Sequence, residues 1–187
     1  MIAGPSGVGK GSVVTRLLAR DRKGLVLSVS VTTRAPRATE RPGTDYAFVD
    51  DAEFDRMIAD DLLLEWADVV GHRSGTPRAF VEEHLAAGRD VLLEIDVQGA
   101  AQVRERIPDA VQIFLEPPSL EELERRLRGR HTEDDDAIRI RLDTAARELQ
   151  DAVWFDHVVV NDDLERASGE VAAIIEASRS QPPEECS

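Results

Sequence analysis

Hydrophobic residues recur along the chain at two different spacings, which predicts alternating helices and strands. Apolar residues three and four apart mark these helical segments: 10–18, 51–60, 78–87, 99–107, 120–127, 133–141 and 164–177. Shorter β-prone runs mark these strand segments: 25–30, 45–49, 62–67, 90–96, 110–115 and 157–160. The apolar run at 90–96 is typical of a buried parallel strand. The pattern as a whole indicates an α/β domain.

Two stretches interrupt this pattern. Residues 71–77 are rich in turn-forming residues and are expected to form a loop. Residues 178–187 have no apolar period and are expected to be a disordered tail. We therefore expect a single domain over 1–177, without an internal repeat or a linker.

A glycine-rich stretch near the start of the chain has the spacing G-x-x-x-x-G-K and ends at Lys10. Its glycines let the backbone curl until successive N–H groups point into one concavity that suits a polyphosphate. Lys10 and the N-terminus of the helix that it opens reach the same phosphates. A plain glycine-rich helix entry is the alternative, but the full spacing with its lysine favours a phosphate loop. The predicted ATP-binding residues here are Gly4, Pro5, Ser6, Gly7, Val8, Gly9, Lys10, Gly11 and Ser12.

The surroundings of this loop depart from the usual pattern in two ways. Gly11 follows Lys10, and the hydroxyl that usually serves Mg²⁺ comes one residue later, so Ser12 is expected to reach the metal through water. A phosphate loop normally follows a strand of about five or six residues. Because only three residues precede Gly4, either the true start lies upstream of Met1 or the first strand is shortened.

Further charged residues are candidates for binding or catalysis. Arg34, Arg37 and Arg41 lie in one proline-rich loop, where guanidinium forks suit a phosphate monoester, although exposed arginines are also ordinary on a solvated loop. Glu65 lies within a strand, either in a site or on the polar face of an edge strand. Asp96 ends the strand 90–96, where an acid serves the metal or its water shell in phosphate-loop proteins. The alternative for Asp96 is the N-cap of the next helix.

Arginines and acids dominate the segment from 125 to 141, which contains a glycine joint at Gly129. Such a segment is a solvated surface in most proteins. Beside a phosphate loop it also fits a mobile lid that brings arginines over a bound nucleotide.

Composition narrows the classes of function. The chain of 187 residues carries 23 Lys and Arg against 37 Asp and Glu, and the net charge of −14 argues against non-specific binding to nucleic acid or a membrane surface. A single cysteine excludes an internal disulfide framework. With no apolar run of membrane-spanning length and no signal-peptide pattern, we expect a cytoplasmic protein.

Taken together, the motifs make the chain resemble the guanylate kinases, which transfer the γ-phosphate of ATP to GMP. The resemblance covers about 1–177, and its middle motifs are much more specific than the phosphate loop. The motifs lie at 4–10, 28–37, 45–48, 64–67, 94–99, 126–130 and 160–163. The resemblance implies an α/β, three-layer P-loop nucleoside monophosphate kinase fold with a parallel core sheet. It also implies a small GMP-binding insert at about 34–80 and a lid at about 126–142.

The resemblance also assigns roles to single residues. It implies GMP-binding residues at Ser30, Arg34, Arg37, Tyr46, Glu65, Thr76 and Asp96. The implied catalytic residues are Lys10, Arg34, Arg126, Arg130 and Arg141, with Mg²⁺ as the cofactor. Asn161 is implied near the adenine of ATP. The chemistry agrees for Glu65, since a carboxylate can accept both the N1–H and the N2–H₂ of guanine.

The chain departs from the guanylate kinase pattern at two further positions. Ser74 stands where a tyrosine usually binds the GMP phosphate, and Arg73 is a candidate to compensate. His131 stands where the lid joint usually has a glycine.

Two other functions fit parts of the sequence. The first is a non-catalytic guanylate-kinase-like scaffold module that binds a phosphorylated peptide, but such modules lack an intact phosphate loop. The second is a kinase of another nucleoside monophosphate, which Glu65 and Thr76 disfavour. The sequence predicts ATP and GMP as small-molecule partners and leaves the oligomeric state open.

Overall fold

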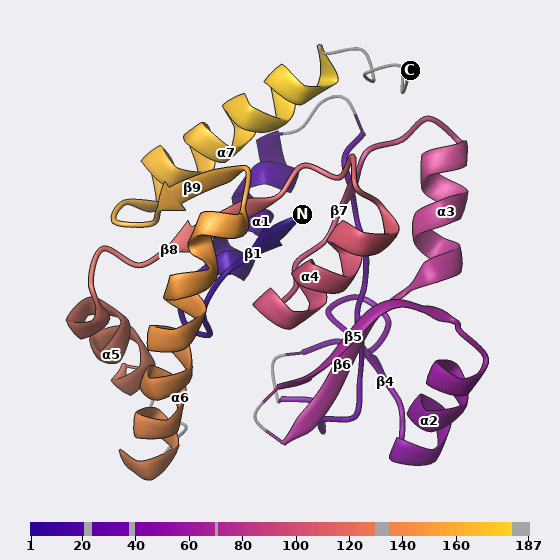
Figure 1. Cartoon of the computed structure of the whole chain (residues 1–187), viewed down its shortest axis with the longest axis horizontal. Helices are drawn as coiled ribbons and strands as arrows, with labels where there is room; N and C mark the ends of the chain where they lie inside the picture. The colour runs from indigo at the N-terminus through magenta and orange to yellow at the C-terminus, as the bar shows by residue number, and fades with distance from the viewer. Residues whose placement is uncertain (21–23, 38–39, 70, 130–134, 181–187) are drawn as a thin grey trace. The chain divides into compact units, whose positions relative to one another are not determined.

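The computed structural model describes residues 1–20, 24–37, 40–69, 71–129 and 135–180. The chain forms two compact units, and Figure 1 shows helices and strands in both. The first unit consists of Met1–Arg20 with Asp109–Ser187, and the second of Asp21–Pro108. Among the described residues, no helix combines the length and the apolar character that crossing a membrane requires.

The first unit is built on a parallel sheet with the strand order β1-β8-β9. Its strands are β1 (Ile2–Ala3), β8 (Ile113–Glu116) and β9 (His157–Val160). Ile2, Phe114 and Val159 are fully buried, so the core of this unit lies around the sheet. The predicted parallel core sheet is confirmed, and β1 is short, as the few residues before Gly4 indicate.

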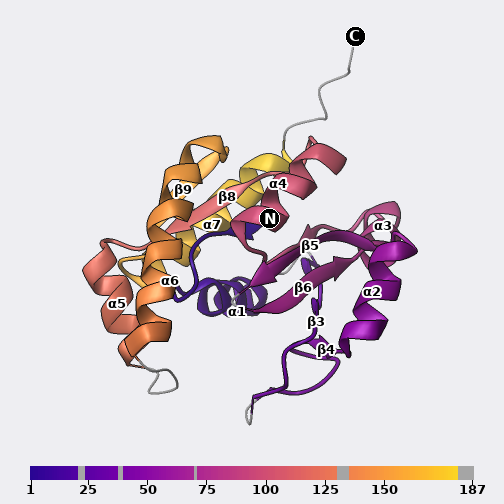
Figure 2. The ribbon, with the colours of Figure 1, turned by 60° about the horizontal axis from the view of Figure 1, so that its bottom comes forward.

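The other elements of the first unit are helices. They are α1 (Lys10–Arg20), α5 (Leu120–Arg128), α6 (Asp135–Glu148), the 3₁₀ helix η1 (Leu149–Trp154) and α7 (Leu164–Arg179). Glu165 of α7 forms ion pairs with Arg16 and Arg20 of α1. Figures 1 and 2 both show α5 beside α6, and Leu123, Leu127 and Ile138 share one apolar cluster between them. The two helices of the predicted lid therefore form a packed pair.

The second unit contains a mixed sheet with the strand order β4-β3-β6-β5. Its strands are β3 (Val31–Thr32), β4 (Ala47–Phe48), β5 (Leu63–Val69) and β6 (His72–Pro77), and a separate parallel pair is formed by β2 (Val26–Leu27) and β7 (Val91–Leu92). Its helices are α2 (Asp51–Ala59), α3 (Arg78–Ala86) and α4 (Val97–Arg106). Phe54 of α2 packs with Val31 and Leu63, so one face of α2 closes the core of this sheet.

The structure corrects the prediction of a loop at 71–77. This segment forms β6, which pairs antiparallel with both β3 and β5. Gly71 has a φ of +76°, a conformation that favours glycine and lets the chain reverse directly between β5 and β6. Two ladders of backbone hydrogen bonds therefore override the turn-forming composition.

Several boundaries also differ from the predictions; the strand predicted at 25–30, for example, is limited to β2 at Val26–Leu27. The strand predicted at 90–96 is shorter in the structure: β7 spans Val91–Leu92, an isolated bridge follows at Glu94, and α4 begins at Val97. Helix α7 continues to Arg179, so the predicted tail is wrong for 178 and 179. Residues 181–187 lie outside the described residues.

Candidate active site

The phosphate loop connects β1 to α1 in the first unit. Gly4, Gly7 and Gly9 have φ values of +144°, +91° and +100°, which L side chains rarely adopt. Space is also lacking, because a Cβ on Gly4 would lie 2.3 Å from the carbonyl oxygen of Leu115. The sequence G-x-x-x-x-G-K therefore builds the curled backbone that its spacing predicts.

Lys10 is the first residue of α1, and its side chain folds back over the loop. Its Nζ donates hydrogen bonds to the carbonyl oxygens of Gly4, at 2.5 Å, and Pro5, at 3.2 Å. The loop carbonyls thus hold the ammonium group close to the concavity that the loop backbone forms. This position suits an ammonium that neutralises phosphate charge.

Ser12 lies exposed in the first turn of α1 and offers one hydroxyl oxygen. The described residues contain no group of three or more His, Cys, Asp or Glu side chains that could hold a metal ion. Mg²⁺ commonly keeps several waters and takes the remaining ligands from substrate phosphates. The residues here fit that mode, in which Ser12 contributes directly or through water.

Asn161 and Arg126 both donate hydrogen bonds to the backbone of the phosphate loop. The side chain of Asn161, at the end of β9, is buried and donates from Nδ2 to the carbonyl oxygen of Val8 at 2.7 Å. Arg126 of α5 donates to the same Val8 oxygen at 3.2 Å and to the backbone oxygen of Asn161 at 2.9 Å. Glu122 accepts from Nε of Arg126 at 2.8 Å. Both residues therefore contact the loop backbone.

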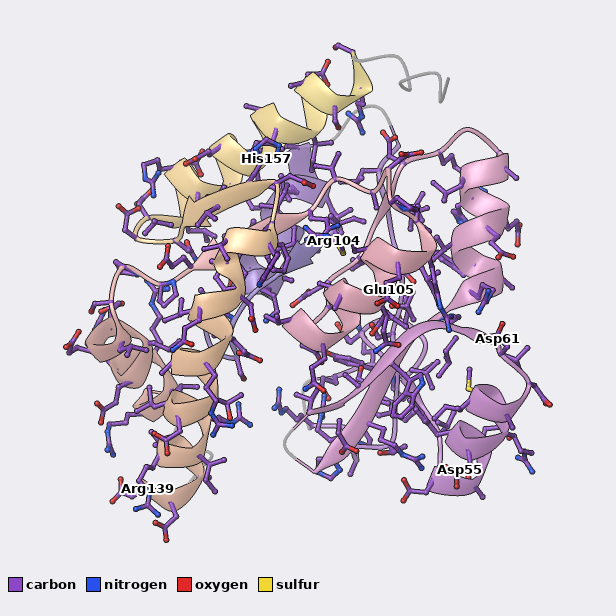
Figure 3. All side chains as sticks on the ribbon, in the orientation of Figure 1. Asp55, Asp61, Arg104, Glu105, Arg139 and His157 are labelled. Carbon is purple, nitrogen blue, oxygen red and sulfur yellow. The ribbon has the colours of Figure 1, made fainter. Side chains whose placement is uncertain are left out.

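Arg141 of α6 reaches the loop from another helix. Its Nη1 donates to the hydroxyl oxygen of Ser6 at 2.9 Å. Arg139, two residues earlier, is exposed near the first turn of α6, as Figure 3 shows, and forms an ion pair with Asp136 at 3.4 Å. Arg130 and His131 lie outside the described residues. Of the described lid arginines, Arg126 and Arg141 thus contact the phosphate loop.

Glu65 lies on β5 in the second unit and is only 3% exposed. Thr76 of the neighbouring strand β6 donates from Oγ1 to Oε1 of Glu65 at 2.6 Å. Burial raises the pKa of the Glu65 carboxyl to about 7, with a smaller contribution from the charge of Asp96, while the hydrogen bond from Thr76 opposes the shift. A solvent-facing position on an edge strand is therefore excluded for Glu65.

Asp96 caps the N-terminus of α4. Its Oδ1 accepts the backbone N–H of Gly99 at 2.8 Å. The capping role that the sequence left as an alternative is thus present. The same carboxylate is close enough to act on the pKa of Glu65, so Asp96 lies at the edge of the site around Glu65 and Thr76.

The arginine-rich loop of the second unit is organised around Glu40. Arg34 donates from Nη1 and Nη2 to the two carboxylate oxygens of Glu40, at 2.9 Å each. The backbone N–H of Arg37 donates to the same carboxylate at 2.8 Å. The hydrogen bond from Arg34 is the main cause that lowers the pKa of Glu40 and keeps this carboxyl ionised. Arg34 also lies over the ring of Tyr46, 5.2 Å from its centroid.

Sequence reasoning missed Glu40. The available signal was an acid in the same loop as Arg34 and Arg37, six and three residues after them. Ser30, which was predicted, lies half-buried just before β3, and its carbonyl oxygen accepts the backbone N–H of Ala47 at 2.9 Å.

The guanidinium of Arg73, the candidate to compensate for the tyrosine that Ser74 replaces, is engaged by two acids of α2. This group pairs with Asp51 at 2.7 Å and Asp55 at 2.5 Å, and it lies over the ring of Phe54. Figure 3 labels Asp55 on α2. Arg73 therefore ties β6 to α2, and Ser74 donates to the carbonyl oxygen of Val31 at 3.3 Å.

Comparison with known proteins agrees with this geometry. The family model described as guanylate kinase matches residues 1–178. A guanylate kinase of Thermobifida fusca (strain YX) is 53% identical over 181 residues, which are 97% of this chain and 92% of that protein. A guanylate kinase of Parasynechococcus marenigrum (strain WH8102) is 56% identical over 167 residues, 89% of this chain and 91% of that protein.

A solved structure is similar as well. The crystal structure of guanylate kinase from Anaplasma phagocytophilum superposes with a TM-score of 0.80 at 36% sequence identity, over 96% of this chain and 85% of that chain. The fold is therefore that of the P-loop nucleoside monophosphate kinases. With its family match, its close relatives and its phosphate loop in agreement, the chain belongs to the guanylate kinase family.

Proposed function

We propose that the protein transfers the γ-phosphate of ATP to GMP and gives ADP and GDP. In this reaction the bond between the γ-phosphorus and its bridging oxygen breaks, and a bond forms to a phosphate oxygen of GMP. The acceptor oxygen is already ionised, so no side chain has to remove a proton. The observation that carries the proposal is the buried carboxylate of Glu65, with Thr76 beside it.

The donor nucleotide is assigned to the first unit. The N–H groups of the phosphate loop and Lys10 bind its β- and γ-phosphates. Arg126 and Arg141, which contact this loop, stabilise the charge of the transferring group, and Arg130 is assigned to the same task. Mg²⁺, when bound with ATP, would be held by Ser12 through water together with the phosphates, and it would supply positive charge that neutralises them. Asn161 fixes the loop through Val8.

The acceptor is assigned to the second unit. Glu65 accepts the N1–H and N2–H₂ of guanine, and the hydroxyl groups of Ser30 and Thr76 face its O6 side. Asp96 lies near the exocyclic amine. The GMP phosphate binds Arg34, Arg37 and Tyr46.

The selectivity of the enzyme among acceptor nucleotides tests this function. With ATP and Mg²⁺, a coupled assay is expected to give a kcat/KM for GMP on the order of 10⁴-fold above those for AMP, UMP and CMP. Such selectivity follows because a mismatched base leaves buried polar groups of the site unpaired. Equal use of GMP and AMP would overturn the assignment of guanine to this site. Absence of transfer to every acceptor would instead favour the scaffold module.

The pH dependence of the reaction tests the role of Glu65. Only the ionised carboxylate accepts both guanine donors, and its pKa in the unliganded protein is about 7. We expect kcat/KM for GMP to rise with pH up to about 7 and then to level off. Well below pH 7, kcat/KM should fall by about tenfold for each pH unit. Once guanine is bound, its N–H donors lower this pKa, so kcat should depend less on pH.

The control for the pH profile is the Glu65→Gln variant. The phosphate of GMP titrates near pH 6 on its own, and this limb should persist in the variant. Identical profiles of kcat/KM in the wild type and the variant would show that Glu65 does not have to be ionised.

A further inference from the structure

The edge of strand β5 is covered by side chains of α4. Gln102 accepts the backbone N–H of Trp66 at 3.2 Å and donates to its carbonyl oxygen at 2.6 Å. Arg106, one turn further along α4, donates to the carbonyl oxygen of Leu63 at 2.7 Å. Because β5 is the last strand of its sheet, these side chains supply hydrogen bonds that a neighbouring strand would otherwise make.

Gly99 lies on the same face of α4, one turn before Gln102. A Cβ built on Gly99 would lie 2.2 Å from Oε2 and 2.9 Å from Cδ of Glu65. The backbone of Gly99 is itself held, because Asp96 accepts its N–H at 2.8 Å. The Glu65 carboxylate therefore occupies the space that any side chain at this position would need.

We propose that Gly99 is a positioning residue, whose missing side chain sets the position of the Glu65 carboxylate, with Gln102 holding α4 in register. This inference rests on the proposed function, because it assigns Glu65 to the guanine base. Gly99 does not touch the substrate and acts through Glu65.

The contacts between α4 and β5 determine which group would move if a larger residue replaced Gly99. Gln102 and Arg106 fix the helix to the strand backbone, and Asp96 fixes its first turn. The carboxylate of Glu65 is the far end of a flexible side chain, so it moves before the backbone does. That movement breaks its 2.6 Å hydrogen bond with Thr76 and displaces both guanine acceptors. A misplacement of about 1 Å can cost on the order of 10²-fold in rate.

The test is the variant Gly99→Ala. We expect kcat/KM for GMP to fall by about tenfold to 10²-fold, while the KM for ATP stays within about twofold of the wild-type value. Gly169 of α7 offers a matched control, because it is also a helical glycine and a Cβ there would meet nothing within 4 Å. Gly169→Ala should leave both constants unchanged.

A double variant separates positioning from general damage. If Gly99 acts through Glu65, Gly99→Ala should cost less than about threefold in kcat/KM for GMP when Glu65→Gln is already present. Independent losses that multiply would contradict the proposal, as would a Gly99→Ala variant with wild-type kcat/KM for GMP. Thermal melting checks that each variant folds.

A second route remains if Gly99→Ala does not fold. Gln102→Ala adds no atoms and only loosens the register of α4, and it should lower kcat/KM for GMP several-fold with the KM for ATP unchanged. An unaltered kcat/KM for GMP in a folded Gln102→Ala variant would then contradict the proposal. If the wild type itself does not prefer GMP over AMP, the proposed function fails. If the wild type prefers GMP and the Gly99→Ala or Gln102→Ala variant keeps the wild-type kcat/KM, only this inference fails.

Discussion

Lys10→Met is expected to fold like the wild type and to lose turnover by about 10²-fold or more, the scale seen when one preorganised charge donor is removed. The ammonium group of Lys10 lies against the loop carbonyls of Gly4 and Pro5, beside the N-terminus of α1. Methionine has a similar length and no charge, so it keeps the volume of the side chain but removes the neutralisation of the phosphates and the two hydrogen bonds to the loop carbonyls.

The measurement is kcat at saturating ATP and GMP, with thermal melting to establish folding. Lys23→Met is a matched control, because it removes the other lysine of the chain at a position outside the phosphate loop. That variant should keep wild-type turnover. Wild-type turnover in a folded Lys10→Met protein would remove the phosphate loop from the mechanism.

Glu65→Gln is expected to lower kcat/KM for GMP by an amount that corresponds to about 2 to 4 kcal/mol of transition-state stabilisation, and to leave ATP binding unchanged. The amide of glutamine offers one acceptor oxygen and an NH₂ group that faces a guanine donor, where the carboxylate offers two acceptors. Steady-state kinetics with GMP and AMP, for both proteins, measure the effect. An unaffected rate with GMP in the variant would contradict the role of Glu65 in reading guanine.

Stability provides the control for this variant. Folding raises the pKa of the Glu65 carboxyl from its ordinary 4.5 to about 7, so the folded state favours the protonated form. The stability that this group contributes is therefore lost as the pH rises from 4.5 to 7. Glu65→Gln carries no such ionisation, and its melting temperature at pH 8 should not lie below that of the wild type.

The sequence predicted best those features that short-range chemistry determines. The phosphate loop needs glycines at fixed spacing, and the structure has Gly4, Gly7 and Gly9 in the conformations that only glycine adopts readily. The N-cap at Asp96 is likewise a contact within one turn, since its carboxylate accepts the N–H of Gly99.

Features that depend on distant partners could not be predicted in this way. The segment 71–77 has the composition of a loop, and it becomes a strand only because β3 and β5 pair with it. The burial of Glu65 depends on α4, more than 30 residues later in the chain, which leaves room for its carboxylate at Gly99. The contact of Arg126 with Val8 joins residues 118 positions apart.

The covered edge of β5 has a consequence for the behaviour of the protein in concentrated solution. Residues 62–67 form an apolar, β-prone run, and an open edge of such a strand is a template on which another chain can add a strand. Gln102 and Arg106 fill the hydrogen-bonding positions of Trp66 and Leu63 with side chains. We therefore expect α4 to hinder the addition of a strand from another chain at this edge.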